Sequence, residues 1–444
     1  MFYLRNFKNF AEAELDDCRP VTLLIGPNGA GKSNLIEAVE MLSFLATGHP
    51  LHEVTDIRRG GGLEVRGGLD ACATFGHDTF TLGHRSKVSV DGEYREADYS
   101  ISVRVGKEPR IVSESLRIQG RDKPVFEVSP SPIRGSADNT VYYDEHYPRR
   151  RKKRPSWTAA DRSALSQYSR FAYQDKKLPE TLQIVDAILS ELAAPAVFDP
   201  IPSVMRNYER ETEGRLARNG FNISPVLYQL CRNSDKPMSD LAEIDFTLET
   251  TALDDRTAPI LRRIAQLPDE PFQGFDFITT EAGDVMFGFK TAHSETPITA
   301  RVLSDGTLRA LGILTALETS RKGTHLVLEE LDNGVHPSRV HLLSEALFDC
   351  AKRHGLHVLA TTQNPATLNA LTAEQIGGVL LVVPDAAKKF ARLLPINELP
   401  GYIEFVEQGR LGDLITRRVY ERHLGADYEG GRKKDVEDWL EALP

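Results

Sequence analysis

Residues 26–33 read Gly-Pro-Asn-Gly-Ala-Gly-Lys-Ser and directly follow the apolar run 21–25. A short buried strand, the pattern G-x-x-x-x-G-K-[ST] and a helix are typical of a phosphate-binding loop, or P-loop. The glycines let several backbone N–H groups face one anion, and the positive end of the helix dipole adds to that field. We therefore predict that nine residues bind a nucleoside triphosphate: Gly26, Pro27, Asn28, Gly29, Ala30, Gly31, Lys32, Ser33 and Asn34.

Two of these residues have roles that a simple glycine turn does not explain. Lys32 would neutralise the β- and γ-phosphates, and the Ser33 hydroxyl would be a ligand of Mg²⁺. The helix is expected to open at Ser33, with Leu35, Ile36 and Val39 among its apolar residues. ATP and Mg²⁺ are therefore the expected cofactors.

Bulk composition excludes several classes of protein. The 444 residues are 41% hydrophobic and 27% charged, as in an ordinary soluble globular protein. No apolar stretch reaches the ~18 residues that a membrane helix needs, and the N-terminus reads as a first strand, so we expect a cytoplasmic protein without membrane contact. The four cysteines lie far apart, which fits reduced thiols and excludes a zinc ribbon. Because the net charge is −10, any nucleic-acid contact needs a local basic patch.

Patterning along the chain predicts an α/β fold with a mixed sheet, an inserted antiparallel β-subdomain and a helical lobe. Short alternating runs separated by Gly and Asp turns fill the stretch from about Leu63 to Gln119, among them Thr79–Leu82 and Lys87–Val90. Helical periodicity dominates from about 161 to 267, and a hairpin-like stretch at 275–289 leads back to α/β alternation. We expect four segments: 1–120 (N-terminal ATPase half), 121–270 (inserted loop and helical lobe), 271–385 (C-terminal ATPase half) and 386–444 (helical tail).

A second apolar strand, 326–328, ends in Glu329 and Glu330. In a nucleotide hydrolase the first carboxylate at such a strand end belongs to the Mg²⁺ shell, and the next orients or deprotonates the attacking water. Glu329 is therefore the expected metal-side carboxylate and Glu330 the expected general base. The alternative is that two glutamates merely end a strand at the surface.

Two further segments complete the predicted site. The run 358–363 is a buried strand that ends in Thr361, Thr362 and Gln363, and we expect it beside the P-loop strand with its end near the γ-phosphate. Residues 303–307 precede a helix, and Ser304 and Asp305 are good N-cap residue types at a second anion-binding helix start. The alternative reading of this turn is a helix cap without a ligand.

These motifs, in this order, resemble those of an ABC-type ATPase with a P-loop NTPase head. More narrowly, the chain is similar to the RecF/SMC-like and OLD-like bacterial AAA-family ATPases, many of which belong to anti-phage or DNA-maintenance systems. The resemblance covers residues 1–385 and is most specific at 26–33, 303–308, 328–337 and 361–365.

The resemblance implies a homodimer, or a higher homo-oligomer, in which two subunits hold two ATP molecules head to tail. Ser304, Asp305 and Gly306 would then belong to the nucleotide site, with Ser304 and Gly306 in contact with the γ-phosphate held by Lys32 of the other copy. Asp332 and His336 would lie in a loop that crosses the interface. Gln167 is the candidate for the glutamine that senses Mg²⁺ from the lobe side.

Three departures from the family pattern matter. The family's switch histidine is replaced by Gln363, which can donate to the γ-phosphate but cannot titrate near neutral pH, so slow hydrolysis is expected. Leu331-Asp332 stands where many relatives have Pro-Glu. The residues after Val383 lack the acidic pattern of the nuclease domain of OLD-type enzymes, so we do not expect this chain to cut nucleic acid by itself.

Basic segments and the tail each allow two interpretations. The run Arg149–Arg154 is either a solvated loop or a phosphate-gripping loop whose six contacts would give a log–log salt slope of about −5, with Tyr147 and Trp157 stacking on bases. Arg58, Arg59 and Arg66 form a second basic spot. The apolar helical face of the tail, from Ile403 to Val419, packs on its own ATPase core or docks a partner.

The sequence therefore predicts an ATP-driven dimer that senses or holds DNA, or another phage-linked signal, and controls a separate effector such as a nuclease or toxin. The alternative is an ATP-dependent oligomeric scaffold that stores the effector while turnover is incidental. A transporter motor is disfavoured, because the inserted lobes leave no obvious surface for coupling to membrane subunits.

Overall fold

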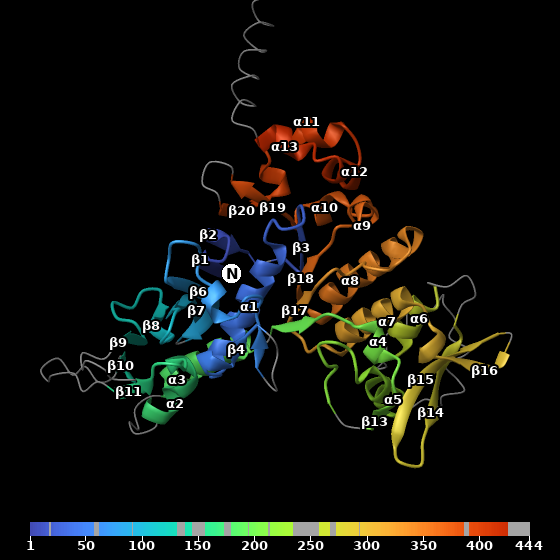
Figure 1. The fold of residues 1–444 in the computed structure, drawn as a ribbon, viewed down its shortest axis with the longest axis horizontal. Coiled ribbons are helices and arrows are strands. Elements are labelled where there is room, and N and C mark those ends of the chain that lie inside the picture. The colour runs from blue at the N-terminus through green and yellow to red at the C-terminus, as the bar shows by residue number, and fades with distance from the viewer. Residues whose placement is uncertain are drawn as a thin grey trace, which may run out of the picture. The chain divides into compact units, whose positions relative to one another are not determined.

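The computed structural model describes residues 1–16, 19–56, 62–90, 92–130, 138–143, 156–172, 179–193, 195–211, 214–233, 257–266, 272–292, 294–385 and 390–424. The chain forms two compact units. The first unit consists of Met1–Cys18, Pro27–Pro195 and Val382–Leu393, and the second of Arg19–Gly26, Ala196–Leu381 and Leu394–Pro444. Figure 1 labels the elements of both units.

The first unit is built on antiparallel strands. In sheet order these are β11 (Ser156–Ala159), β10 (Asp138–Tyr143), β9 (Phe126–Pro130), β8 (Arg110–Ile118), β7 (Glu93–Arg104), β6 (Thr79–Val90), β1 (Phe2–Phe7) and β2 (Phe10–Leu15). β20 (Phe390–Pro395) then pairs with β2 in parallel, at Phe10 and Ala391. The predicted antiparallel sheet is therefore confirmed.

Two predicted runs, Thr79–Leu82 and Lys87–Val90, belong to the single long strand β6. No turn separates them, because β6 pairs with β7 without interruption from Thr79 to Val90. Gly83 leaves room for the Tyr3 ring, since a Cβ would come within 2.0 Å of Tyr3 Cζ. The predicted run at Leu63 is not part of this sheet. It forms β5 (Leu63–Glu64), which pairs with β4 (Val54–Thr55) in a separate two-stranded sheet.

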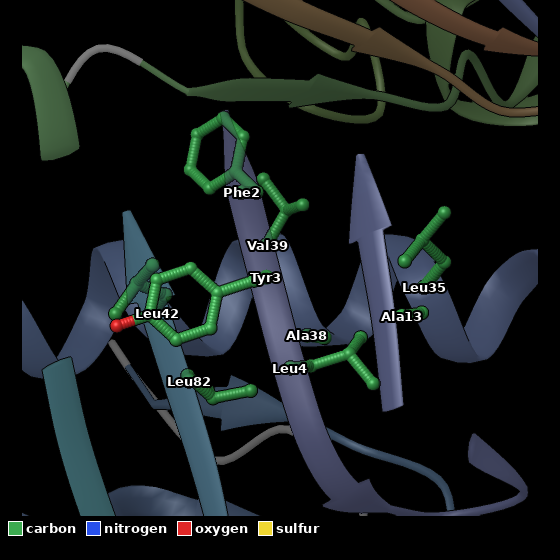
Figure 2. Close-up of a pocket in the computed structure, with 9 residues that line it drawn as sticks. All are labelled: Phe2, Tyr3, Leu4, Ala13, Leu35, Ala38, Val39, Leu42 and Leu82. Carbon is green, nitrogen blue, oxygen red and sulfur yellow. The ribbon is translucent and has the colours of Figure 1, made fainter. Parts of the chain in front are cut away.

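The P-loop helix, α1 (Lys32–Ala46), lies on the β1–β2–β6 part of the first unit. Leu35, Ala38, Val39 and Leu42 recur at helical spacing, so they share one face and pack on the sheet. These side chains line a cavity of about 10 Å³ together with Phe2, Tyr3, Leu4, Ala13 and Leu82. Figure 2 labels all nine residues. A space of that size holds about one water molecule, so it is a packing defect and not a ligand site.

A buried carboxylate fixes the position of α2 (Ala164–Ala172). Glu114 on β8 is fully buried and accepts hydrogen bonds from the backbone N–H groups of Ala164 (2.7 Å) and Leu165 (3.0 Å). The hydroxyl groups of Ser163 and Tyr99 also donate to it. Burial raises the pKa of Glu114, while these hydrogen bonds act in the opposite direction. The start of α2 therefore has a fixed place on the sheet. A third helix of this unit, α3 (Pro179–Leu192), packs on β6.

The second unit contains a parallel sheet in the order β19 (Val379–Asp385), β3 (Val21–Ile25), β18 (His357–Thr361), β17 (His325–Leu328) and β12 (Ala196–Phe198). All five residues of β3 are buried, as expected for a parallel strand covered on both faces. The strand predicted at 358–360 does lie beside the P-loop strand, since Thr361 pairs with Leu24. The chain is thus an α/β protein with mixed strand pairing, which confirms the predicted fold class.

Helices and a small antiparallel sheet complete the second unit. The hairpin predicted at 275–289 forms as β14 (Gly274–Thr279) and β15 (Asp284–Thr291), with β16 (Ser294–Thr299) and β13 (Glu209–Arg210) also paired to β15. The helices are α4 (Pro202–Met205), α5 (Ile223–Asn233), α6 (Thr257–Ile264), α7 (Asp305–Thr319), α8 (Val340–His354), α9 (Pro365–Asn369) and α10 (Ala373–Ile376). Among the described residues, no helix is both long and apolar enough to cross a membrane.

The described part of the C-terminal tail packs on its own unit. Its helices are α11 (Tyr402–Glu407), α12 (Leu411–Thr416) and α13 (Tyr420–Leu424), and α12 contacts α9. The Gly412 N–H donates to Asn369 Oδ1 (2.8 Å), and a Cβ on Gly412 would lie 2.1 Å from the Pro365 carbonyl oxygen. Of the two interpretations of the tail, these contacts therefore favour packing on its own chain. Ile403 remains exposed.

A charged cluster joins α7 to α8. Glu318 is 1% exposed and accepts hydrogen bonds from Arg353 Nη2 (2.6 Å) and Cys350 Sγ (3.0 Å), with His354 Nε2 at 2.9 Å. Burial alone would raise the pKa of Glu318, but the hydrogen bonds from Arg353, Cys350 and His354 outweigh it and lower the pKa. The ionised carboxylate is therefore the form that stabilises this helix pair.

We expect Arg353→Ala to lower the free energy of unfolding of this unit by about 1–3 kcal/mol at pH 7, because a buried carboxylate loses its charged donor. The pKa of Glu318 is lower in the folded state than in the unfolded state. The stabilisation is therefore complete above the unfolded value of about 4.3 and is lost as the pH falls through the folded value.

Urea unfolding at pH 7 and near pH 4, with Arg321→Ala as a surface control, measures this difference. An Arg353→Ala effect that is absent at pH 7, or that grows on acidification, would contradict the assignment.

Candidate nucleotide-binding site

The P-loop has the backbone shape that its glycines require. Gly26, Gly29 and Gly31 have φ values of 142°, 78° and 119°, in the region that L side chains rarely adopt. α1 begins at Lys32, one residue before the predicted start, and no side chain caps its first turn. The N-terminus of a helix, with the positive end of its dipole, is the end that favours an anion. Lys32 is 8% exposed, and its Nζ donates to the Pro27 carbonyl at 3.1 Å.

The P-loop is supported by an asparagine that no sequence motif indicated. Asn9, in the tight turn between β1 and β2, donates from Nδ2 to the Ala30 carbonyl (2.8 Å). The predicted site residue Asn34 donates from Nδ2 to Asn9 Oδ1 (2.7 Å), which fixes the orientation of the Asn9 amide. A Cβ on Gly31 would lie 2.7 Å from Asn9 Nδ2, so the loop packs directly on this side chain.

The same turn is tied to α1 by charge. Lys8 and Arg66 both bond to the Glu37 carboxylate, Arg66 through Nε at 2.8 Å, and the Lys8 and Glu37 side chains are each 9% exposed. Arg66, predicted as part of a basic spot, is thus bonded to an acidic residue of the P-loop helix. The other members of that spot, Arg58 and Arg59, lie outside the described residues.

Three chain segments leave the parallel sheet of the second unit at one edge. β3 is followed by Gly26, β17 by Glu329 and Glu330, and β18 by Thr362 and Gln363. Because β3, β18 and β17 run parallel in adjacent positions, their carboxyl ends meet at this edge. This is the edge at which open α/β sheets bind ligands.

Glu330 is exposed and is held in a defined position. Its φ of 46° is one of four positive values at non-glycine residues in the described part of the chain, and its N–H donates to Thr361 Oγ1 (2.8 Å). Asn333 Nδ2 donates to Oε2 (2.8 Å) and Gln363 Nε2 to Oε1 (3.4 Å). The structure thus brings together the predicted base and the predicted switch glutamine, and adds Asn333. Sparsely populated backbone conformations of this kind recur at functional sites.

The loop after Glu330 is anchored inside the second unit. Asp332 is 5% exposed and accepts hydrogen bonds from the hydroxyl groups of Thr362 and Thr367. Burial raises the pKa of Asp332, while the two hydroxyl groups act to lower it. The Asp332 carboxylate therefore points into the interior of the second unit, whereas His336 is exposed and accepts the Ser338 N–H.

Residues 303–307 form a turn at the start of α7, as the sequence predicts, and its anion-binding role stays a prediction. Ser304 Oγ accepts the Thr307 N–H at 3.1 Å, so the side chain is a helix cap, and both Ser304 and Asp305 are exposed. Gly306 packs against the loop that follows Glu330, where a Cβ would lie 2.1 Å from the Gly334 carbonyl oxygen. Arg206 bonds to both Leu303 and Asp305.

The remaining predictions concern Gln167 and the basic run with its flanking aromatic residues. Gln167 on α2 is partly exposed and donates from Nε2 to the Ser163 carbonyl (3.1 Å), within the first unit. Trp157 on β11 is 62% exposed. The basic run Arg149–Arg154 and Tyr147 lie outside the described residues.

Comparison with known proteins is consistent with this geometry. Residues 21–369 match the family described as "AAA domain, putative AbiEii toxin, Type IV TA system". The RecF DNA replication and repair protein of Gloeobacter violaceus is 47% identical over 98 residues, which are 21% of this chain and 25% of that protein. The RecF protein of Cyanothece sp. is 55% identical over 42 residues, 10% of this chain and 11% of that protein. The chain thus matches a quarter or less of the length of these relatives.

Two solved structures resemble the chain at low sequence identity. The SMC head domain from Thermotoga maritima has a TM-score of 0.37 at 13% identity and covers 89% of this chain and 97% of its own. A second SMC head, solved with the C-terminal winged-helix domain of ScpA, has a TM-score of 0.38 at 11% identity and covers 88% and 96%.

A P-loop directly after a parallel strand, with carboxylates at the end of another strand of the same sheet, defines the class of P-loop NTPases. Within that class, the family match extends over more than half of the sequence. The chain therefore belongs to the AAA-domain family described as "AAA domain, putative AbiEii toxin, Type IV TA system".

We expect Lys32→Ala to abolish nucleotide binding, because the loop loses the side chain that neutralises the phosphates. Equilibrium binding of a fluorescent ATP analogue measures this, with Lys107→Ala on an exposed turn as the matched control. Unchanged ATP affinity in the Lys32→Ala protein would refute the assignment of the phosphate site.

Proposed function

We propose that this protein binds Mg·ATP, closes head to tail around two nucleotides as a homodimer, and hydrolyses ATP slowly. The observation that carries the proposal is the shared sheet edge, where Gly26 starts the P-loop and Glu330 and Gln363 follow adjacent parallel strands. In this proposal the backbone N–H groups of residues 26–34 and the Lys32 ammonium hold the triphosphate.

The proposed ligands of Mg²⁺ are the Ser33 hydroxyl and the Glu329 carboxylate, with Gln167 as a further candidate, since oxygen atoms of these types are the ligands that Mg²⁺ prefers. When bound, the ion neutralises charge on the phosphates. Glu330 accepts a proton from the attacking water as the water oxygen bonds to the γ-phosphorus. The bond from that phosphorus to the bridging oxygen breaks, and ADP leaves with the electron pair.

The turn at 304–306 is proposed to complete the site on the other copy. Ser304 and Asp305 are exposed at the start of a 15-residue helix, and the neighbouring Val302 is 72% exposed. An exposed apolar side chain beside a polar, amide-rich turn suits a surface that is covered when two copies meet. Ser304 and Gly306 would contact the γ-phosphate that Lys32 of the other copy holds.

We further propose that the dimer senses or holds DNA, or another phage-linked signal, and controls a separate effector such as a nuclease or toxin. The description of the matched family includes a toxin–antitoxin system, and the RecF relatives are named for DNA replication and repair. The second candidate is a scaffold, in which ATP closes an oligomer that stores the effector and turnover is incidental. The scaffold is favoured by Gln363, which stands where the family pattern has a histidine. Because glutamine cannot titrate near neutral pH, this change fits a protein in which turnover is incidental.

Glu330→Gln is expected to bind ATP but to hydrolyse it much more slowly, because the amide cannot accept the proton. Light scattering of this variant with and without Mg·ATP should show a dimer only with the nucleotide. In cells, a reset switch locked in this way should lose function, whereas a scaffold should still assemble and work. A monomer at saturating ATP would contradict the closure.

Wild-type turnover is expected to stay below about 10 per second, near the median of enzymes, because Gln363 cannot exchange protons near neutral pH. Steady-state phosphate release measures it, with Gln363→Ala as the companion variant. A faster wild-type rate would remove the argument that ATP acts more as a clamp than as fuel.

A further inference from the structure

The anion-binding turn carries an acidic residue. Asp305 is the first residue of α7, between Ser304 and Gly306, and it is 69% exposed at its side chain. A carboxylate stabilises a helix N-terminus, but beside a triphosphate it adds a repulsive charge. A turn that receives a phosphate needs this charge to be compensated.

The compensating group comes from a distant part of the sequence. Arg206 caps the C-terminus of α4, and its Nη2 donates to Asp305 Oδ1 (2.6 Å) and to the Leu303 carbonyl (2.7 Å). One nitrogen therefore bonds both to the acidic side chain and to the backbone directly before the turn. Arginine remains charged at any physiological pH, and its side chain here is only 26% exposed.

Packing fixes the place of Arg206 against α7. The preceding Met205 is fully buried against Gly312, where a Cβ would lie 3.1 Å from Met205 Cε. Upstream of α4, Asp199 faces Arg309 of α7 at 3.8 Å. The segment 199–206 is thus held along α7, and the Arg206 guanidinium is set at the turn before any ligand arrives.

We propose that Arg206 is a positioning residue for the nucleotide of the partner copy. It cancels the charge of Asp305 and holds the Leu303 carbonyl, so that Ser304 and the amides of the turn meet the γ-phosphate without a neighbouring negative charge. This inference rests on the proposed closure around ATP and adds the residue that makes an acidic turn compatible with an anion.

The test compares charge variants in the Glu330→Gln background, where closure is measured without turnover. Arg206→Gln keeps a donor for Leu303 but leaves Asp305 uncompensated. We expect the dissociation constant of the ATP-bound dimer to rise about tenfold or more, as for uncompensated like charges at an interface. ATP affinity of the P-loop, measured below the dimerisation concentration, should stay within about twofold, since Lys32 is untouched.

Adding Asp305→Asn to Arg206→Gln should restore most of the dimer affinity, because the charge that needed compensation is gone. If the ion pair were merely structural, adding Asp305→Asn would not restore the dimer affinity, because the pair would still be broken. Asp305→Asn alone should dimerise at least as tightly as the parent. Arg321→Gln, after the end of α7, is the matched control, and thermal unfolding checks that each variant is folded.

The results distinguish a failure of the proposed function from a failure of the role of Arg206. If the Glu330→Gln parent stays monomeric with ATP, the proposed function itself fails, and this inference with it. If the parent closes but Arg206→Gln closes equally well, or if Asp305→Asn does not rescue it, only the role of Arg206 is overturned. Should Arg206→Gln not fold, a weaker dimer for Asp305→Asn alone overturns the same role.

Discussion

The parallel pairing of β3 with β18, and of β18 with β17, is the constraint on which the candidate site depends. The register joins Leu24 to Thr361 and Leu328 to Ala360, so the three strands end at one edge. Their side chains are almost wholly buried on both faces, so burial of apolar side chains holds all three strands inside the sheet. The same burial that stabilises the sheet therefore also determines which polar residues come next at its edge.

From this edge, hydrogen bonds hold the loop after β17 on several sides. Thr361 and Asn333 fix Glu330, while Thr362 and Thr367 bind Asp332 in the interior. The Gly334 carbonyl lies against Gly306 at the start of α7, and Arg206 holds the other side of that turn. The Glu330 loop and the Ser304 turn are thus parts of one continuous packed structure, which holds both in place.

Much of this was predictable, because the strongest signals are local in sequence. The P-loop, the strand that ends in Glu329 and Glu330, and the cap at Ser304 each follow from residues within one short segment. The antiparallel sheet followed from alternation, although Gly83 continues β6 where a turn was expected between two runs. Contacts between distant segments were not predictable. Asn9 supports Ala30, and Arg206 compensates Asp305 from 99 residues away, and neither carries a motif.

The central claim is that the triphosphate lies between the P-loop of one copy and the Ser304 turn of the other. A structure of the Glu330→Gln protein with Mg·ATP tests it most directly. The account predicts a two-fold dimer in which Ser304 and Gly306 contact a γ-phosphate bound to the other copy's P-loop. A nucleotide-bound assembly in which these turns face solvent, away from every neighbouring nucleotide, would contradict it.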